Sequence, residues 1–303
     1  MIKVQENVPL SLHSNYRIGG PAKFFREVSS IADLEDLSKY EKIFILGGGT
    51  NILFRDVGFD GLVIKNNIKG IKLDGNKLIV GGGELISNIL NFAIENSLSG
   101  LEWAGGLPGT IGGAVRGNAG AFGGEIKASV LLVRSFNLRT KRTLERNKEE
   151  CDFKYRWSVF KTSPDELIAS VTLELESGDE EEIRKIANEK IQYRKNRHPL
   201  EYPNIGSTFK NIPYDKLPEK LQIEFKSYIK TDPFPVIPTT KLLALADLKG
   251  KRMGDAMISD KHPNFIVNLG GAKASDVLAL IKIAKETIKE KWGIELEEEI
   301  MLV

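Results

Sequence analysis

The spacing of apolar residues along the chain predicts a mixture of strands and helices. Compact apolar runs and alternating patterns predict strands at 42–46, 61–65, 129–137 and 166–174. Apolar residues spaced three and four apart predict helices at 30–40, 85–96, 179–194 and 275–292. This mixture indicates an α+β protein.

Residues that favour helix ends and turns refine this outline. Ser30 and Ser275 are suited to cap the helices that follow them, and Gly293 is suited to end the last helix. The sequence Asp74-Gly75-Asn76 predicts a hairpin between strands at 71–73 and 77–80. The remaining residues, 294–303, are then expected to form a terminal strand.

Prolines divide the chain. Pro199 and Pro203 interrupt a helical pattern, so we expect a domain boundary near residue 198. The segment Pro213–Pro238 contains five of the twelve prolines and predicts an insertion, which could be a lid, a partner surface or a decorated loop.

Composition narrows the class of protein. The 303 residues suffice for two or three domains, and a net charge of +2 with interspersed signs argues against nucleic-acid binding. Cys151 is the single cysteine and the three histidines are scattered, so neither a disulfide nor a metal site is expected. The first ten residues do not have the pattern of a signal peptide, and no apolar run is long enough to span a membrane. A cytoplasmic protein is expected.

Glycine clusters are the main chemical signal. Nine of the 29 glycines lie between Leu101 and Ile126, and triple glycines occur at 47–49 and 81–83. Neither the Walker pattern nor the G-x-G-x-x-G pattern of a Rossmann turn is present. The residues alone leave two interpretations: backbone amides that cradle a pyrophosphate, or structural turns.

Several longer segments are more specific. They are SNYRIGGPA (14–22), LGGGTNILFRD (46–56), GLPGTIGGAVRGNAGAFGGEI (106–126), YRWSVFK (155–161), EYPNIGSTFKN (201–211), LKG (248–250) and KHPNFIVN (261–268). In this order they resemble the UDP-N-acetylenolpyruvoylglucosamine reductase family, a family of flavoenzymes of peptidoglycan synthesis. No counterpart of the tyrosine-bearing loop of the family's longer form is found, so the chain resembles the shorter form.

The resemblance implies a fold and a cofactor. It implies an FAD-binding domain at 1–197, made of α+β subdomains at about 1–67 and 68–197 as in the vanillyl-alcohol-oxidase-like FAD fold. An α+β substrate-binding domain would follow at 198–303. The residues that would hold FAD are Gly47, Gly48, Gly49, Thr50, Asn51, Ile52, Pro108, Gly109, Thr110, Gly112, Gly113, Asn118 and Gly120.

The resemblance also implies a reaction. NADPH would reduce FAD, and UDP-N-acetylglucosamine enolpyruvate would then accept the hydride to give UDP-N-acetylmuramate. Arg156 matches the family's arginine, Ser207 the serine that donates a proton, and Glu299 the glutamate that acts with the arginine. Because three acidic residues are consecutive at 297–299, Glu297 is the alternative to Glu299.

Substrate-binding residues follow in the same way. Lys210, Asn211 and Lys249 match positions that bind the sugar nucleotide, and Tyr155 is expected against flavin or substrate or, equally, within the core. Asp255 departs from the family's usual Gly-Gly and adds a negative charge near this region. Two other functions stay open: an oxidase of another small alcohol, and a flavin- or nucleotide-binding protein without catalysis. The oligomeric state is also open, a monomer being one option.

Overall fold

The computed structural model describes residues 4–34, 37, 40–232 and 234–303. These residues form two compact units. Unit 1 comprises the described residues of Met1–Val8, Ala22–Gly48 and Phe59–Arg194, and unit 2 comprises Pro9–Pro21, Gly49–Gly58 and Lys195–Val303. The division near residue 195 compares with the boundary that the sequence predicts near 198, but two short N-terminal segments group with the C-terminal unit.

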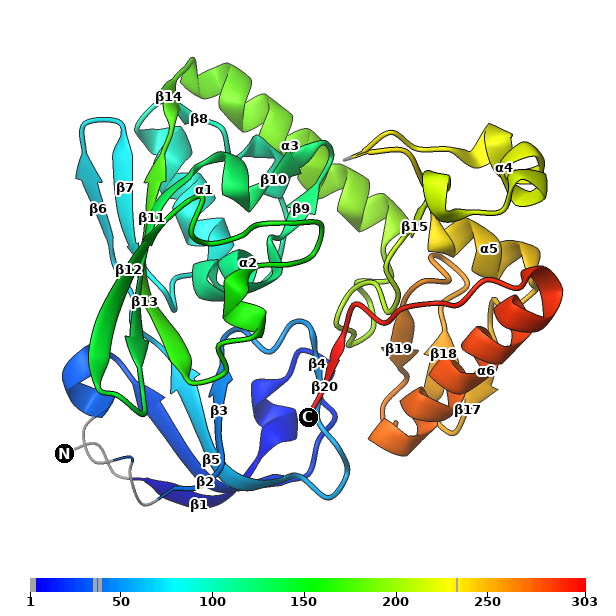
Figure 1. Cartoon of the computed structure of the whole chain (residues 1–303), viewed down its shortest axis with the longest axis horizontal. Coiled ribbons are helices and arrows are strands. Elements are labelled where there is room, and N and C mark those ends of the chain that lie inside the picture. Colours follow the sequence, from blue (N-terminus) through cyan, green and yellow to red (C-terminus); the bar gives the residue numbers. More distant parts are fainter. Residues whose placement is uncertain (1–3, 35–36, 38–39, 233) are drawn as a thin grey trace. The chain divides into compact units, whose positions relative to one another are not determined.

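Unit 1 contains two principal sheets (Figure 1). In the first, β2 (Pro21–Val28) and β3 (Ile43–Leu46) pair in parallel with β5 (Phe59–Asn66), and β1 (Gln5–Pro9) lies at the edge beside β2. The second is antiparallel, in the order β12 (Arg142–Asn147), β11 (Val130–Asn137), β13 (Glu166–Glu174), β7 (Lys77–Gly81) and β6 (Ile71–Asp74). The predicted strands of this region and the hairpin at 71–80 are confirmed.

Helices cover the antiparallel sheet. Helix α1 (Ile86–Glu95) buries Ile89 and Ala93 of the face that the sequence predicts, whereas Leu85 precedes the helix and is exposed. It lies with α2 (Ile111–Gly117) on one side of the sheet (Figure 1). The long helix α3 (Glu180–Arg197) follows the last strand. Short strands complete the unit: β8 (Leu98–Ser99), β9 (Gly120–Ala121), β10 (Gly124–Glu125) and β14 (Glu176–Ser177). Short 3-10 turns are η3 (Glu102–Ala104), η4 (Ile126–Ala128) and η5 (Val159–Lys161).

Unit 2 is built around α6 (Ala274–Trp292). Val277, Leu280, Ile281 and Ala284 are buried, as their helical spacing predicts. Next to this helix lies an antiparallel sheet of β17 (Arg252–Met253), β18 (Ala256–Ile258) and β19 (Ile266–Asn268). The other elements are η1 (Leu10–His13), β4 (Ile52–Leu53), β15 (Ile212–Pro213), η6 (Tyr214–Lys216), α4 (Glu219–Phe225), η7 (Lys226–Tyr228), β16 (Val236–Ile237), α5 (Thr239–Leu245) and β20 (Met301–Leu302).

The predicted insertion at 212–238 is a packed element. Leu217, Leu221 and Phe225 are buried in the core of unit 2. The indole N–H of Trp292 on α6 lies 3.3 Å from the carboxylate of Glu224 and donates to it. The segment therefore owes its position to apolar burial and is a packed part of unit 2 rather than a decorated loop.

Three predictions at element ends need correction. The expected helix at 30–40 is a 3-10 turn, η2 (Ile31–Leu34), where Asp33 accepts backbone hydrogen bonds from Ser29 and Ser30; residues 35–36 and 38–39 lie outside the described residues.

At the start of α6 the N-cap is Lys273, not Ser275, because the carboxylate of Asp56 accepts the first backbone N–H groups. The terminal strand is limited to Met301–Leu302, which pair in parallel with β4. Gly293 does end α6, with a φ of 70°.

Candidate functional site

Two glycine segments meet in unit 1. A Cβ atom on Gly47 would lie 2.7 Å from Oγ1 of Thr110, and one on Gly48 would lie 2.9 Å from Cα of Gly109. Both distances are too short for any side chain, so the turn after β3 and the turn before α2 approach as only glycine allows. Gly48 and Gly113 are exposed at this contact. The arrangement leaves accessible main chain where a flat or extended ligand can approach closely.

The ends of α2 are fixed by two residues predicted to hold the cofactor. Thr110 is the N-cap, and its hydroxyl accepts a hydrogen bond from Gly113 N–H. Asn118 ends the helix with a φ of 41° and is 0% exposed. Its side-chain amide donates to Glu125 and to the carbonyl of Lys154. The Asn118 side chain therefore acts by supporting the segment that contains Tyr155 and Arg156.

Tyr155 and Arg156 occupy the tip of a tight turn. The backbones of Lys154 and Trp157 exchange hydrogen bonds across it, at 3.0 and 3.1 Å. Arg156 has a φ of 53°, which is uncommon for a residue other than glycine and costs on the order of 1–3 kcal/mol. Its guanidinium lies 5.1 Å from the centre of the Tyr155 ring and donates to the Gly120 carbonyl at 3.0 Å. The turn thus holds a fixed cation against the glycine-rich segment.

Ser207 belongs to unit 2 and is half-buried. Gly206 before it has a φ of 85°, with open space around the position of a Cβ atom. The next two residues are clamped by Asn264, whose carbonyl accepts from Thr208 N–H and whose side chain exchanges hydrogen bonds with Phe209. Asn264 lies in the KHPNFIVN segment, but no local pattern indicates that its side chain positions the serine segment.

The acidic run 297–299 pairs with the segment that follows Ser207. Glu299 N–H donates to the Thr208 carbonyl at 2.8 Å, and Lys210 N–H donates to the Glu297 carbonyl at 2.9 Å. This antiparallel register brings residue 299 beside the serine segment. The Glu297 side chain pairs with Lys210, and the Glu298 side chain pairs with Lys285 on α6 at 2.9 Å.

The segment 49–52 also approaches Glu299. The Asn51 side chain donates to the Glu299 carbonyl at 3.0 Å, and Ile52 pairs with Met301. Gly49 has a φ of 65°, and a Cβ atom there would lie 2.1 Å from the carbonyl oxygen of His13. Thr50 is half-buried in the same turn. Unit 2 therefore brings together Gly49, Thr50, Asn51, Ile52, Ser207 and Glu299.

The expected substrate-binding residues of unit 2 have distinct environments. Lys210 is ion-paired to Glu297, whereas Lys249 is exposed. The Asn211 side-chain oxygen accepts from Thr239 N–H, so its amide N–H₂ points to other acceptors. The carboxylate of Asp255 accepts from Gly271 N–H at 3.0 Å and so supports the loop before α6.

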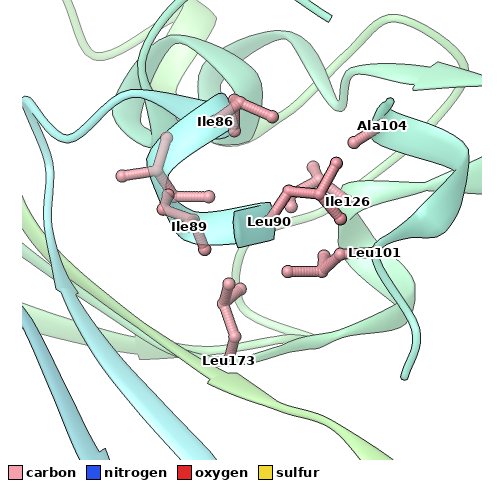
Figure 2. Close-up of a pocket in the computed structure, with 8 residues that line it drawn as sticks. Ile86, Ile89, Leu90, Leu101, Ala104, Ile126 and Leu173 are labelled. Atoms are coloured by element: carbon pink, nitrogen blue, oxygen red, sulfur yellow. The ribbon is translucent and has the colours of Figure 1, made fainter. Parts of the chain in front are cut away.

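Other polar and apolar features lie away from these residues. Cys151 is 0% exposed, and burial raises the pKa of its thiol to about 11, as suits a small core residue. Eight apolar side chains, from Ile86 to Leu173, line a cavity of about 10 Å³ in unit 1 (Figure 2). This void is no larger than one water molecule and its lining residues are apolar, so it offers a ligand no room and a water no hydrogen-bond partner. In the described part of the chain, no three His, Cys, Asp or Glu residues are grouped to hold a metal ion.

No helix among the described residues is both long and apolar enough to cross a membrane.

Comparisons with known proteins cover both units. Residues 23–140 match the family model of the FAD binding domain, and residues 198–303 match that of the UDP-N-acetylenolpyruvoylglucosamine reductase C-terminal domain. A UDP-N-acetylenolpyruvoylglucosamine reductase from Caldanaerobacter subterraneus is 37% identical, with 99% of this chain and 94% of the relative covered. The Bacillus subtilis reductase of the same name gives the same identity and coverage.

A solved structure agrees with these relatives. The crystal structure of UDP-N-acetylenolpyruvylglucosamine reductase from Thermus caldophilus superimposes with a TM-score of 0.81 at 30% identity. The match covers 100% of this chain and 99% of the other. Sequence and fold therefore agree over the full length.

Proposed function

The chain belongs to the UDP-N-acetylenolpyruvoylglucosamine reductase family, and from this premise we propose that it reduces UDP-N-acetylglucosamine enolpyruvate to UDP-N-acetylmuramate with NADPH, using bound FAD. The observation that carries the proposal is the register in unit 2, where Glu299 N–H donates to Thr208, the residue after Ser207. This hydrogen bond puts the backbone of Glu299 next to the segment that contains Ser207, and these are two of the three residues that the proposed chemistry requires. The reaction belongs to the synthesis of peptidoglycan precursors in the cytoplasm.

The glycine segments of unit 1 fit a flavin nucleotide. The contact of Gly47 and Gly48 with residues 109–110 leaves no room for side chains and exposes main chain on both turns. Backbone N–H groups on such turns suit the pyrophosphate of a dinucleotide. We assign Gly47, Gly48, Pro108, Gly109, Thr110, Gly112, Gly113 and Gly120 to the cofactor in unit 1, with Asn118 as their support, and Gly49, Thr50, Asn51 and Ile52 in unit 2. When bound, FAD would carry the hydride from NADPH to the substrate.

Arg156 supplies a permanent positive charge. Hydride addition to the enolpyruvyl double bond places negative charge on the neighbouring carbon and its carboxylate, and a fixed cation lowers the free energy of that charge. The tight turn and the hydrogen bond to Gly120 hold the guanidinium in place before the charge develops. Guanidinium suits this role because it stays protonated and presents several donors in one plane.

Ser207 and Glu299 are assigned to protonation and polarisation of the substrate. The Ser207 hydroxyl donates the proton that completes the addition, since a carbanion adjacent to a carboxylate is basic enough to take a proton from an alcohol. Glu299 acts with Arg156 in polarising the substrate. Lys210, Lys249 and the free amide N–H₂ of Asn211 bind the diphosphate of the sugar nucleotide, to which ammonium and amide donors are suited. Tyr155 lies against the bound ring system.

The test is NADPH oxidation by FAD-loaded protein in the presence and absence of the enolpyruvyl substrate. We expect oxidation to depend on the substrate. Ser207→Ala should still accept hydride from NADPH but lose substrate reduction by about 10²- to 10⁴-fold, the range for losing a positioned acid. Substrate-independent oxidation with rapid reaction of oxygen would indicate an oxidase, and absence of both half-reactions would indicate a binding protein without catalysis.

A further inference from the structure

Arg194, near the end of α3, has a buried hydrogen-bond donor that the protein does not satisfy. The side chain is 9% exposed, and its Nε–H donates to the Gly105 carbonyl at 2.9 Å. Its Nη2 is buried and has no hydrogen-bond partner in the described part of the chain. Leaving such a group unpaired costs about 1–3 kcal/mol, more when it is charged. Nη2 is therefore available to an acceptor that the described residues do not supply.

The surroundings of Arg194 carry an excess of positive charge. Its guanidinium lies 5.2 Å from the centre of the Phe122 ring, and Lys190 Nζ lies 5.4 Å from the same ring. No carboxylate among the described residues is within ion-pair distance of Arg194. Burial and, to a smaller extent, the nearby charge of Arg156 together lower the pKa of Arg194 to about 10. A buried cation next to the half-buried cations Arg156 and Lys190 favours an anionic ligand.

The glycine-rich segment is shaped around this side chain. Gly106 has a φ of 71°, and a Cβ atom there would lie 3.0 Å from Cδ of Arg194. Phe122 packs edge-on against Tyr193 of the same helix, with ring centres 5.2 Å apart. The arginine is thus held on one side by the Gly105 carbonyl and on another by Phe122. Of the guanidinium N–H groups, Nε–H donates to the Gly105 carbonyl, and Nη2 has no acceptor among the described residues.

We propose that Arg194 is a ligand-binding residue of the reductase site, whose Nη2 donates to a planar anionic group of a ligand that lies on the glycine-rich segment. This inference rests on the proposed function, which supplies two groups of that chemistry. One is the carboxylate of the enolpyruvyl substrate. The other is the N1–C2 carbonyl edge of the reduced flavin, which carries negative charge after reduction.

The test compares Arg194→Gln with Lys190→Gln in FAD-loaded protein. Glutamine removes the charge but keeps a donor for the Gly105 carbonyl, and Lys190 is the matched cation on the same helix and the same ring. If the substrate carboxylate is the partner, Arg194→Gln should weaken substrate binding, followed by the flavin spectrum, by about tenfold or more, as expected for a lost charged hydrogen bond. If the flavin is the partner, it should raise the pKa of the reduced flavin and lower its reduction potential.

Lys190→Gln should leave substrate binding within about twofold of the wild type, and the flavin pKa and reduction potential unchanged, because the Lys190 side chain is only half-buried. Arg194→Lys keeps the positive charge, so it should show a smaller change in substrate binding or in flavin pKa and potential than Arg194→Gln does. It replaces Arg194→Gln in the test if that variant does not fold. The proposal is overturned if binding, flavin pKa and potential are all unchanged in both Arg194 variants. Failure of the proposed function can be told apart from failure of the Arg194 proposal. In that case the reduced flavin of the wild-type protein would not be reoxidised by the substrate.

Discussion

Glu298 and Glu299 are adjacent in the chain but have different partners. Glu298 pairs with Lys285 on α6, and the backbone of Glu299 is bonded to Thr208 and Asn51. Alternation along extended backbone places their side chains on opposite faces. The structure therefore offers a matched pair of carboxylates for testing which one takes part in the reaction.

We expect Glu299→Gln to lower kcat by about 10²-fold or more, because an amide does not replace the carboxyl group that acts with Arg156 in polarising the substrate. Glu298→Gln should change kcat less than about threefold, since its exposed ion pair contributes little. Steady-state kinetics of both variants with NADPH and substrate provide the measurement. An equal loss in the two variants would contradict the assignment of Glu299, and a loss confined to Glu297→Gln would favour that alternative.

His262 should make stability depend on pH. Burial lowers its pKa to about 4, and Lys230 adds to the effect. The ring packs against His198 and Phe265, with centroids 5.5 and 4.7 Å away. The unfolded chain binds a proton near pH 6.5, whereas the folded chain does so only near pH 4. Stability is therefore complete above about pH 6.5 and falls as the pH drops toward 4.

The predicted loss over this window is up to about 3 kcal/mol, from 1.36 kcal/mol per pKa unit. Replacing His262 by Phe should flatten the pH dependence of the free energy of unfolding between pH 4 and 6.5. Urea denaturation at several pH values, followed by tryptophan fluorescence, measures this slope. A variant with the same slope as the wild type would show that other groups dominate.

Residue-level prediction from sequence depends on whether a residue's role is local. Gly206 and Ser207 are recognisable because they lie in a contiguous motif. Arg194 and Asn264 act through contacts with residues 89 and 55 positions away, namely Gly105 and Phe209. Local patterns contain no information on such distant partners, so these roles emerge only from the fold.

At the scale of elements, α6 is held by a residue far away in sequence. The carboxylate of Asp56 accepts from Ala274 N–H at 2.7 Å and from Ser275 N–H at 3.0 Å. The sequence predicted the helix and its apolar face from their spacing, but it placed the cap on Ser275 because local rules consider only neighbouring residues. The observed cap links the segment 49–58 to the last helix within unit 2.

Asp56→Ala should lower the free energy of unfolding by about 1 kcal/mol, the usual loss for a helix cap. Asp60→Ala is the control, because Asp60 forms an exposed ion pair with Lys23 and its loss should change the free energy of unfolding much less. Urea denaturation of both variants measures the difference. Equal effects would mean that Asp56 does not stabilise the helix start.

The insertion at 212–238 provides another element-scale prediction. Phe225 is 1% exposed and contacts the core of unit 2, whereas Ile223 on the same helix is 69% exposed. Phe225→Ala should lower the free energy of unfolding by about 3–5 kcal/mol, and Ile223→Ala by less than about 0.5 kcal/mol. Thermal unfolding of both variants tests whether the insertion is part of the core. A small effect of Phe225→Ala would mean that it folds as an independent surface loop.

At the scale of the whole molecule, the division into units is not contiguous in sequence. Residues 9–21 and 49–58 group with the C-terminal residues because of particular long-range bonds. The Tyr16 hydroxyl donates to the Ile266 carbonyl, 250 positions away, and β4 pairs with β20. Proline placement predicts a boundary near residue 198, but local patterns contain no information on these long-range pairings.

Each of the two units contains residues that the family's reaction would use. Unit 1 contains the glycine segments and Arg156, and unit 2 contains Ser207, Glu299 and the two lysines that we assign to the sugar nucleotide. The central claim is that this chain passes hydride from NADPH to an enolpyruvyl group by way of FAD.

The most direct test follows the visible spectrum of FAD-loaded protein without oxygen. Addition of NADPH should bleach the flavin absorbance, and addition of UDP-N-acetylglucosamine enolpyruvate should restore it with formation of UDP-N-acetylmuramate. Ser207→Ala should bleach normally and recover far more slowly. Protein that binds no flavin, or whose bleached flavin is not restored by the substrate, would contradict the account.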